Sequence, residues 1–550
     1  MKKYLGDRVG AALKALSYNG YAALTFDKPK DEAHGDSTTN IAMLLAKSVK
    51  KNPRAVAQEI IDKLEIDPRF VSNVEIAGPG FINFRFTDEF FTAQVGDILK
   101  LGKSFGKINI GNGKKTQVEY VSANPTGPLS VGHGRQAAIG DTIANLLVWT
   151  GYDVTREYYY NNAGRQMRML AESTYARYRQ LFDSSYIFPE DGYQGDYIRE
   201  IADDLKKDRG DSMIAKSLEE SLAICKEFAE QKLFEAIKKV LSRMGVVHGV
   251  FFNEDSLYKS GNIEEVISEF RKKGLAYDQD GAVWLKTSAL GLDQDRVIVK
   301  SSGEPTYRLP DIAYHREKFR RGFELIVDVF GADHIATIPD VLAGVKALGY
   351  DPDKVKVVIH QFVTLMRDGE QVKMSKRLAN FVTLDELIDE VGSDAVRFFF
   401  LMRSTSSHLE FDLNLAKEQS EKNPVYYLQY AHARIASILR FADEQGTFKA
   451  SDSLADIDYS LLKGPTEIAL AKLLLDFPET IEYCAISFEP HRLATYLQDV
   501  AAAFSRFYHE HRVVIPELDI AKARLALCLA AKIVLSNGCS ILGITAPERM

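Results

Sequence analysis

Ser122-Ala-Asn-Pro-Thr-Gly-Pro-Leu-Ser-Val-Gly-His133 is a turn rich in proline and glycine between two regular segments. Thr116 to Val121, before it, has the pattern of a strand, and Gly134 to Trp149, after it, has the pattern of a helix. Backbone N–H groups and the helix dipole at such a helix start attract phosphate. The stretch therefore predicts a strand-turn-helix unit with His133 at an anion-binding position.

The strand and helix patterns continue on both sides of this unit and predict the start of a nucleotide-binding parallel sheet. Helices are predicted after Asp311 and over Ile338 to Leu348. The Gly-x-Gly-x-x-Gly fingerprint is absent, so NAD and FAD are not expected. The other strands expected in the sheet are Asp153 to Tyr160, Val283 to Lys286, Arg296 to Lys300, Glu324 to Phe330 and Lys354 to His360.

A second cationic segment, Lys373-Met-Ser-Lys-Arg377, follows the hairpin turn signal Arg367-Asp-Gly-Glu370. It places three cationic side chains within five residues. A phosphate-attracting turn and a lysine loop are what nucleotidyl transfer requires of a protein, because its catalysis is mostly positioning and charge neutralisation.

The chain divides into three predicted domains around this core. Residues 1–105 read as an α+β unit, 106–404 as the α/β catalytic domain, and 405–550 as an all-α domain. A charged, helical stretch at about 165–285 is predicted to be an insertion that is not part of the sheet.

Composition indicates a globular cytoplasmic protein. Of the 550 residues 46% are hydrophobic and 26% charged, and we expect neither a membrane span nor a signal peptide. The four cysteines lack Cys-x-x-Cys spacing, so neither a zinc knuckle nor a disulfide framework is expected. The net charge of −7 leaves RNA binding open without supporting it.

The turn and the lysine loop together resemble the two signature motifs of class I aminoacyl-tRNA synthetases, HIGH and KMSKS. Further stretches make the whole chain similar to the bacterial arginyl-tRNA synthetase family. They are Glu119 to Pro128, Gly164-Arg-Gln166, Thr306 to His315, Phe330-Gly-Ala-Asp-His334, Asn423 to Arg434 and Ala546 to Met550. One departure is Ser130, where the family usually has histidine. Serine can donate one hydrogen bond to a phosphate oxygen but carries no charge.

The resemblance implies a class I synthetase fold and an arginine–tRNA ligase. ATP and L-arginine would form arginyl-adenylate, and the ester would then pass to the 3′ end of tRNA(Arg). His133, Lys373, Ser375 and Lys376 would be catalytic. Gly132, Met374, Asp333 and His334 would join His133 and the two lysines in binding ATP. Mg²⁺ would accompany ATP, although no dedicated carboxylate cage is apparent. The HIGH-type element comprises Ala123, Asn124, Pro125, Thr126, Gly127, Pro128, Leu129, Ser130, Val131, Gly132 and His133.

Arginine as substrate demands carboxylates, because a guanidinium has five donors and no acceptor. Asp311 and Tyr307 lie four residues apart at a predicted helix start, hence on one face. The resemblance places the guanidinium against these two, and the α-amino group near Asn124 and Ser122, with Glu119 also in the pocket. Asp311 after Pro310 also fits an ordinary residue at a helix start.

Contacts with tRNA are expected at both ends of the chain. The family resemblance assigns the helix around Tyr426 to an anticodon-binding domain, and likens Phe81 and Asn83 to a pair that touches the D-loop. A tyrosine stripe at helical spacing also fits a packed core, and Phe81 and Asn83 also fit internal strand positions. The predicted contacts of the helix are Tyr426, Tyr427, Gln429, Tyr430, His432 and Arg434.

Two other functions remain compatible with the motifs. One is a class I synthetase for another amino acid, which the acidic pocket candidates disfavour. The other is a paralogue that binds tRNA without charging it, for which Ser130 is the only support. The family also implies a monomer that needs no protein partner, and activation that depends on bound tRNA.

Overall fold

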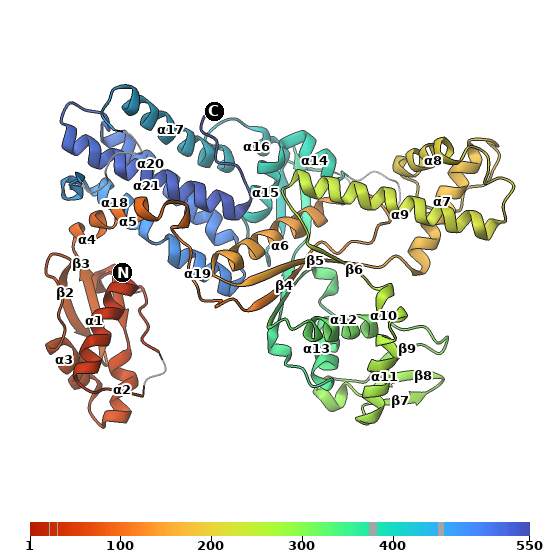
Figure 1. Ribbon diagram of the computed structural model, residues 1–550, viewed down its shortest axis with the longest axis horizontal. Coiled ribbons are helices and arrows are strands. Elements are labelled where there is room, and N and C mark those ends of the chain that lie inside the picture. The colour runs from red at the N-terminus through yellow and green to blue at the C-terminus, as the bar shows by residue number, and fades with distance from the viewer. Residues whose placement is uncertain (21–22, 30, 373–381, 449–455) are drawn as a thin grey trace.

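The computed structural model describes residues 1–20, 23–29, 31–372, 382–448 and 456–550. The predicted lysine loop, with Lys373, Met374, Ser375 and Lys376, lies outside these described residues. Figure 1 shows an elongated molecule in which an N-terminal unit, a lobe of α7 to α9 and a unit of β7 to β9 project from the region of the central sheet and the C-terminal helices.

A parallel five-stranded sheet, ordered β11-β10-β4-β5-β6, forms the centre. When the five strands are numbered in chain order and read from the β6 edge, their order is 3-2-1-4-5. This is the order of a doubly wound nucleotide-binding sheet. The order reverses between β4 and β10, so ligands are expected at the carboxyl ends of these two strands. The bounds are β4 Lys115–Glu119, β5 Asp153–Tyr160, β6 Val250–Asn253, β10 Leu325–Gly331 and β11 Val355–His360.

Helices cover both faces of this sheet, and successive side chains along β4 contact the helices on alternate faces. Val118 belongs to the core shared with α6 (Val131–Trp149), and the ring of Tyr120 contacts α6 at Gly140. Gln117 and Glu119 point to the other face, where they contact α12 (Arg308–Arg320). Helix α13 (Ile338–Ala347) connects β10 to β11.

Two expectations about the sheet are wrong. Strand β6 lies inside the stretch assigned to the insertion, yet it pairs with β5 as the fifth strand of the sheet. The segments Val283 to Lys286 and Arg296 to Lys300 instead contribute to a separate antiparallel sheet of β7 (Ala276–Gln279), β8 (Ala282–Leu285) and β9 (Arg296–Val299). Alternating hydrophobicity identifies a strand but not its partner, which explains both errors.

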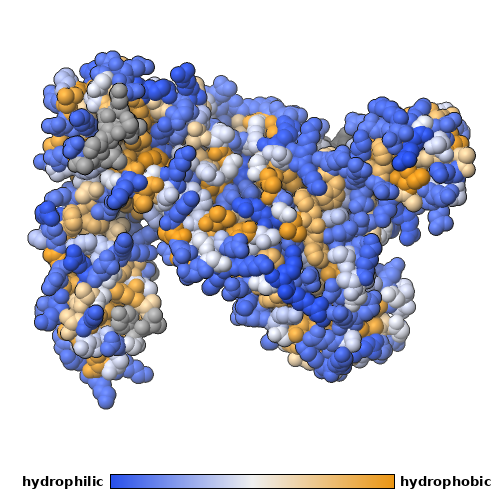
Figure 2. Space-filling model, viewed as in Figure 1, coloured by the Kyte–Doolittle hydropathy of each residue, from blue (hydrophilic) through white to orange (hydrophobic). Residues whose placement is uncertain are grey.

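The insertion projects as a lobe of α7 (Gly164–Gln180), α8 (Asp196–Arg209) and α9 (Leu218–Arg243), at the right of Figure 1. A capping box of Ser217 and Glu220 begins α9. The lobe has small apolar cores of its own, and its surface mixes hydrophilic and apolar side chains (Figure 2).

The N-terminal unit has a three-stranded antiparallel sheet, β1-β3-β2, packed with helices. Helix α1 buries Leu5, Val9 and Leu13 on one side. Helices α4 (Asp88–Ala93) and α5 (Val95–Leu101) follow β3, and α5 belongs to the main core. The other bounds are α1 Lys2–Ala15, β1 Ser37–Thr39, α2 Ile41–Val49, α3 Pro53–Asp62, β2 Val71–Ala77 and β3 Phe81–Phe86.

The C-terminal part is helical, as predicted, with one exception. Strand β14 (Leu409–Asp412) pairs in parallel with β12 (Val363–Arg367), which also forms a hairpin with β13 (Glu370–Gln371). The helices are α14 Leu384–Val391, α15 Ser393–Leu401, α16 Leu413–Lys417, α17 Pro424–Glu444, α18 Pro465–Leu475, α19 Phe477–Ser487, α20 His491–Glu510 and α21 Leu518–Leu542.

Helix α21 is long and apolar enough to cross a membrane by length and composition alone, although no membrane span is expected from the sequence. Its most apolar window is 72% buried within the protein, so packing accounts for its composition.

A buried arginine helps to tie this helix to the catalytic core. Arg397 of α15 donates from Nε to the carbonyl of Leu542 (2.9 Å), from Nη1 to that of Met244 (2.7 Å) and from Nη2 to Asp141 of α6 (2.7 Å). Its side chain is fully buried.

Candidate active site

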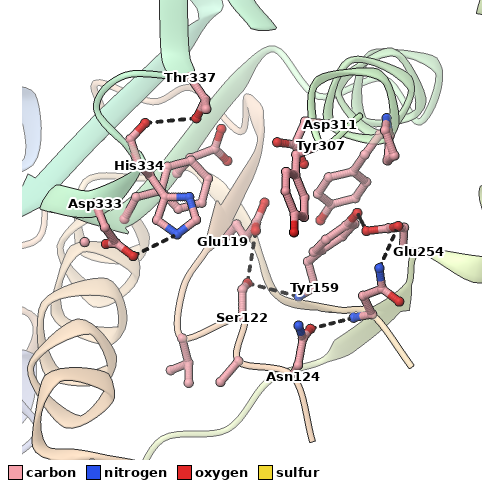
Figure 3. A pocket seen from close by; sticks show the side chains of 18 of the residues that line it. Glu119, Ser122, Asn124, Tyr159, Glu254, Tyr307, Asp311, Asp333, His334 and Thr337 are labelled. Carbon is pink, nitrogen blue, oxygen red and sulfur yellow. Dashed lines mark hydrogen bonds and ion pairs between the residues drawn. The ribbon is translucent and has the colours of Figure 1, made fainter. Parts of the chain in front are cut away.

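A cavity of about 1270 Å³ opens at the carboxyl ends of β4 and β10, where the strand order reverses. It brings together His133 and all the predicted arginine-binding residues. Figure 3 shows the latter, which are Asp311, Tyr307, Glu119, Ser122 and Asn124, around the cavity. Residues from the turn after β4, from α12 and from the segment after β10 surround it.

The turn after β4 has an unusual backbone. Val121 and Ser122 have positive φ values of 71° and 42°, a region that L-residues, and β-branched ones above all, rarely adopt. Ser122 Oγ donates to Glu119 Oε1 (3.0 Å) and accepts from the backbone N–H of Tyr159 (3.1 Å). The two bonds fix the end of β4 against β5.

Asn124 lies farther along the same turn. Its Oδ1 accepts from the backbone N–H of Asn161 (2.9 Å), and its Nδ2 donates to Oε1 of Gln166 (3.0 Å). These two hydrogen bonds fix the orientation of the Asn124 side chain at the cavity.

Asp311 in the first turn of α12 faces the same cavity (Figure 3). Its carboxylate has no hydrogen-bond or ion-pair partner among the described residues, and burial raises its pKa to about 7. Tyr307, at the N-cap of α12, lines the cavity with a side chain that is 89% exposed. An unpaired carboxylate in a cavity is suited to a cationic ligand.

A second carboxylate, Glu254, was missed by the sequence analysis. It follows β6, in the stretch assigned to the insertion, and accepts from Tyr159 OH (2.6 Å) and Asn161 Nδ2 (2.7 Å). Burial raises its pKa. The short apolar strand Val250–Asn253 followed by an acid was the available signal.

The predicted residue Glu119 belongs to a row of buried charges at the cavity, whose other members, Lys318 and Asp328, the sequence analysis missed. Lys318 Nζ contacts Glu119 Oε2 (2.6 Å) and Asp328 Oδ1 (2.7 Å). These carboxylates are paired neighbours on β4 and β10. Burial opposes ionisation of Asp328, but Lys318 and His315 outweigh it and hold its pKa below the ordinary value. Burial raises the pKa of Glu119, although Lys318 opposes this.

The other end of the cavity contains the start of α6. His133 Nδ1 accepts from the backbone N–H of Ser130 (3.1 Å) and lies 3.2 Å from Ser130 Oγ. A neutral His133 therefore carries its proton on Nε2. At Gly132 the nearest atom to an added Cβ would be Ser130 Oγ, 3.7 Å away. Protein packing does not demand glycine there, which is consistent with a closely approaching ligand.

Asp333 and His334 lie in a 3-10 turn after β10 and line the same end. Their side chains are 69% and 55% exposed, and His334 Nε2 is 3.8 Å from Asp333 Oδ2. The ring of His334 stacks on Phe330, with centroids 5.2 Å apart. Within the described residues, no group of three or more His, Cys, Asp or Glu could hold a metal ion.

A second hollow of about 760 Å³ lies between α17 and α20. Arg434 crosses it, with its guanidinium carbon 5.9 Å from the ring centroid of Tyr430 and 5.0 Å from that of Tyr508. Tyr426 stacks along the helix on Tyr430 at 6.3 Å. This combination of a cation with accessible rings is typical of a base-stacking surface.

Four other predicted RNA contacts are held in internal interactions. Gln429 donates to Asp394 (2.7 Å), and Tyr427 OH donates to Ser505 (3.2 Å). His432 is 2% exposed, with Nδ1 2.8 Å from the carbonyl of Pro547. Asn83 is 4% exposed on β3, whereas Phe81 begins that strand and is half-buried.

Comparisons with known protein families divide the chain into three matched regions. Residues 3–86 match the arginyl tRNA synthetase N terminal domain, and residues 94–405 match the catalytic domain of tRNA synthetases class I (R). Residues 428–550 match the DALR anticodon binding domain.

Full-length relatives agree with these matches. The chain is 51% identical to an arginine–tRNA ligase of Desulfotalea psychrophila, over 97% of this chain and 96% of that protein. It is 49% identical to that of Salinibacter ruber over the whole of both. A solved arginyl-tRNA synthetase of Campylobacter jejuni superposes with a TM-score of 0.77 at 30% identity, covering 84% of this chain and all of that one. The Thermus thermophilus arginyl-tRNA synthetase shares the fold, with a TM-score of 0.75 at 23% identity over the whole of both chains.

Proposed function

The chain belongs to the arginyl-tRNA synthetase family, and we propose that the cavity at the end of β4 and β10 performs the reaction for which its relatives are named. As an arginine–tRNA ligase, the protein forms arginyl-adenylate from arginine and ATP and releases diphosphate. It then transfers the arginyl group to the 3′ end of tRNA(Arg) and releases AMP. The single observation that carries this assignment to the cavity is the unpaired carboxylate of Asp311 beside a second carboxylate, Glu254.

Arginine binds with its guanidinium toward Asp311 and Glu254. A guanidinium offers five donors, and the two carboxylates supply the acceptors. Tyr307 covers the cavity at the start of α12. The α-amino group lies toward Glu119, Ser122 and Asn124, whose hydrogen bonds hold the turn after β4 in place. This leaves the α-carboxylate directed toward the start of α6.

ATP occupies the other end. The open side of Gly132 accommodates the adenosine, and Asp333 and His334 lie near it. His133 Nε2–H donates to the phosphate where the arginine carboxylate attacks, and the dipole of α6 favours the negative charge that accumulates there. Ser130 takes no charge into the site; its backbone N–H sets the tautomer of His133.

The lysine loop neutralises the remaining negative charge of the ATP phosphates. Lys373, Ser375 and Lys376, with Met374 beside them, are assigned to ATP and the leaving diphosphate from the motif alone. Magnesium enters with ATP, because it retains several waters and binds phosphates in preference to an all-protein cage.

Transfer RNA spans the molecule. The hollow of Arg434, Tyr430 and Tyr426 is assigned to anticodon bases, and Phe81 to a contact of the N-terminal domain. Asn83, Tyr427, Gln429 and His432 take part only if their internal contacts rearrange. We also propose that the domains span 1–105, 106–404 and 405–550, and that the protein acts in the cytoplasm without a protein partner.

Diphosphate exchange in the presence of tRNA(Arg) tests the assignment on the native protein. Arginine should support exchange, whereas lysine and citrulline, a neutral isostere of arginine, should fail by at least about 10³-fold because they leave buried carboxylates unpaired. Exchange with citrulline at a rate near that of arginine would refute the two-carboxylate pocket, and exchange with a different amino acid would refute the reaction.

A further inference from the structure

We propose that His315 is a positioning residue of the arginine pocket: by donating from both ring nitrogens it ties the first turn of α12 to β10 and places a positive charge beside Asp311. The inference rests on the assignment of the guanidinium to Asp311 above. It concerns a residue that does not touch the substrate and acts only through its neighbours.

The proton count follows from the partners of the two ring nitrogens. His315 Nδ1 lies 2.7 Å from the backbone carbonyl oxygen of Asp311, and a carbonyl can only accept. His315 Nε2 lies 2.8 Å from Asp328 Oδ2, while Asp328 Oδ1 accepts from Lys318. The ion pair with Lys318 keeps Asp328 an acceptor, so both nitrogens of His315 donate. A histidine that donates from both nitrogens is an imidazolium.

His315 also joins the two ends of the amino-acid pocket. Asp311, His315 and Lys318 are spaced i, i+4 and i+7, on one face of α12. From the carbonyl of Asp311, bonds run through His315, Asp328 and Lys318 to Glu119, which accepts from Ser122. The side chains of His315, Asp328 and Lys318 are 7%, 0% and 0% exposed, so water does not interrupt the row.

The charges in this row balance, and Asp311 is left over. Lys318 and His315 supply two positive charges against the two negative charges of Glu119 and Asp328. The carboxylate of Asp311 is then an additional negative charge awaiting the guanidinium. Burial disfavours that charge, and among the groups around it His315 is the strongest counterweight.

The other charged groups on the elements around α12 are already paired or belong to the pocket. On α11 (Asn262–Lys272), Glu265 and Glu269 pair with Arg316 on the other side of α12. On α13, Asp340 pairs with Arg308 and Arg296. On the side of α10 (Asp255–Lys259), the pocket contributes Glu254 and Tyr258, and the row itself contributes Asp311, Lys318, Glu119 and Asp328. His315 differs from these groups in that its ring bonds to the backbone of Asp311.

The native protein provides the first test. In full-length protein with ¹⁵N-labelled histidine at pH 8.5, ordinary histidines are neutral. We expect one histidine with both ring nitrogens at the chemical shifts of an imidazolium, assigned by its loss in His315→Gln, or in His315→Asn if the glutamine variant does not fold. A protein without an imidazolium at this pH overturns the proposal.

The second test is the pH profile of kcat/KM for arginine in diphosphate exchange. Asp311 must be ionised to pair with the guanidinium, so the profile falls on its acidic side. Removing the cation in His315→Gln raises the pKa of Asp311, so this limb should move to higher pH by about one unit. The loss should be about tenfold at pH 6.5 and small at pH 9, with KM for ATP unchanged.

His248→Gln is the matched control, because His248 is also buried but lies against Tyr120 and Tyr158, where burial lowers its pKa to about 4. Its replacement disturbs packing without removing a cation, so the limb should not move. An equal loss at every pH in His315→Gln would show a purely structural role and overturn the proposal. The variant Asp311→Asn separates the two assignments. If Asp311→Asn retains arginine specificity, the proposed function fails. If Asp311→Asn loses arginine specificity but the acidic limb of His315→Gln does not move, only the present inference fails.

Discussion

The two ends of the catalytic cavity are built differently. At the amino-acid end, Lys318 and Asp328 are fully buried, Glu119 is 3% exposed, and each of these three charges has a partner within 3 Å, whereas Asp311 is left for the ligand. At the nucleotide end, Asp333 and His334 are more than half exposed and 3.8 Å apart. The amino-acid end is therefore set before any ligand binds, whereas the nucleotide end presents side chains that ligand contacts can still order.

The difference matches what each ligand demands. Every synthetase binds ATP, so the nucleotide end needs affinity without discrimination. The amino-acid end must reject other side chains, and a buried polar site does so because the wrong ligand leaves its groups unpaired.

Asp311→Asn should have the largest effect, because it removes the charge that faces the guanidinium. We expect kcat/KM for arginine to fall by about 10³-fold, from the loss of a desolvated charge pair. Diphosphate exchange with tRNA present measures this, and KM for ATP serves as the internal control. A loss below tenfold would show that the amino-acid end does not discriminate by charge.

Lys318→Met should weaken the fold more than any change at the nucleotide end. It leaves Glu119 and Asp328 buried without their shared cation, which should lower the free energy of unfolding by about 3 kcal/mol. Urea denaturation at neutral pH would reveal this as a lower midpoint. An unchanged midpoint would mean that the buried row does not stabilise the pocket.

The pH dependence should differ between the two ends. Burial raises the pKa of Asp311 to about 7, so below that pH the free protein holds a proton that arginine binding must displace. Arginine kcat/KM should fall about tenfold per pH unit below 7, and KM for ATP should stay nearly constant down to about pH 6. Initial-rate profiles with each substrate varied would check this, and parallel profiles would contradict it.

Asp333→Asn should have the smallest effect. The carboxylate is exposed and its contact with His334 is long, so KM for ATP should rise less than about threefold, in line with the low energy of exposed ion pairs. Arginine KM should not change. A rise above about thirtyfold would show that the nucleotide end is as preorganised as the other.

Sequence reasoning found the parts of the site that short motifs carry. Glu119, Asn124 and His133 lie on one strand-turn-helix unit, and Asp311 lies in a predicted helix start, so the family resemblance could be carried onto them through short motifs. Their convergence in one cavity is what the structure adds for the described residues. The lysine loop stays a prediction from its motif.

The supporting residues could not be found in this way. Lys318 and His315 are polar residues in a helix rich in charged side chains, which ordinarily indicates a solvated position; only the neighbouring strands reveal that they are buried. Glu254 was hidden because β6 has four residues and no local signal tells which sheet it joins. The assignment of β8 and β9 to the wrong sheet has the same origin.

The guanidinium of Arg397 has a consequence for dissecting the molecule. It uses the carbonyl at the end of α21 as one of its three acceptors, and a side chain at Gly543 would collide with it, since an added Cβ would lie 2.2 Å from Nη2. Shortening the polypeptide before this point leaves Nε of the buried Arg397 without its acceptor, although Asp141 of α6 and the carbonyl of Met244 remain. We therefore expect the catalytic domain to be insoluble when it is expressed without helix α21. The C-terminal helix is thus part of the packing of the catalytic domain.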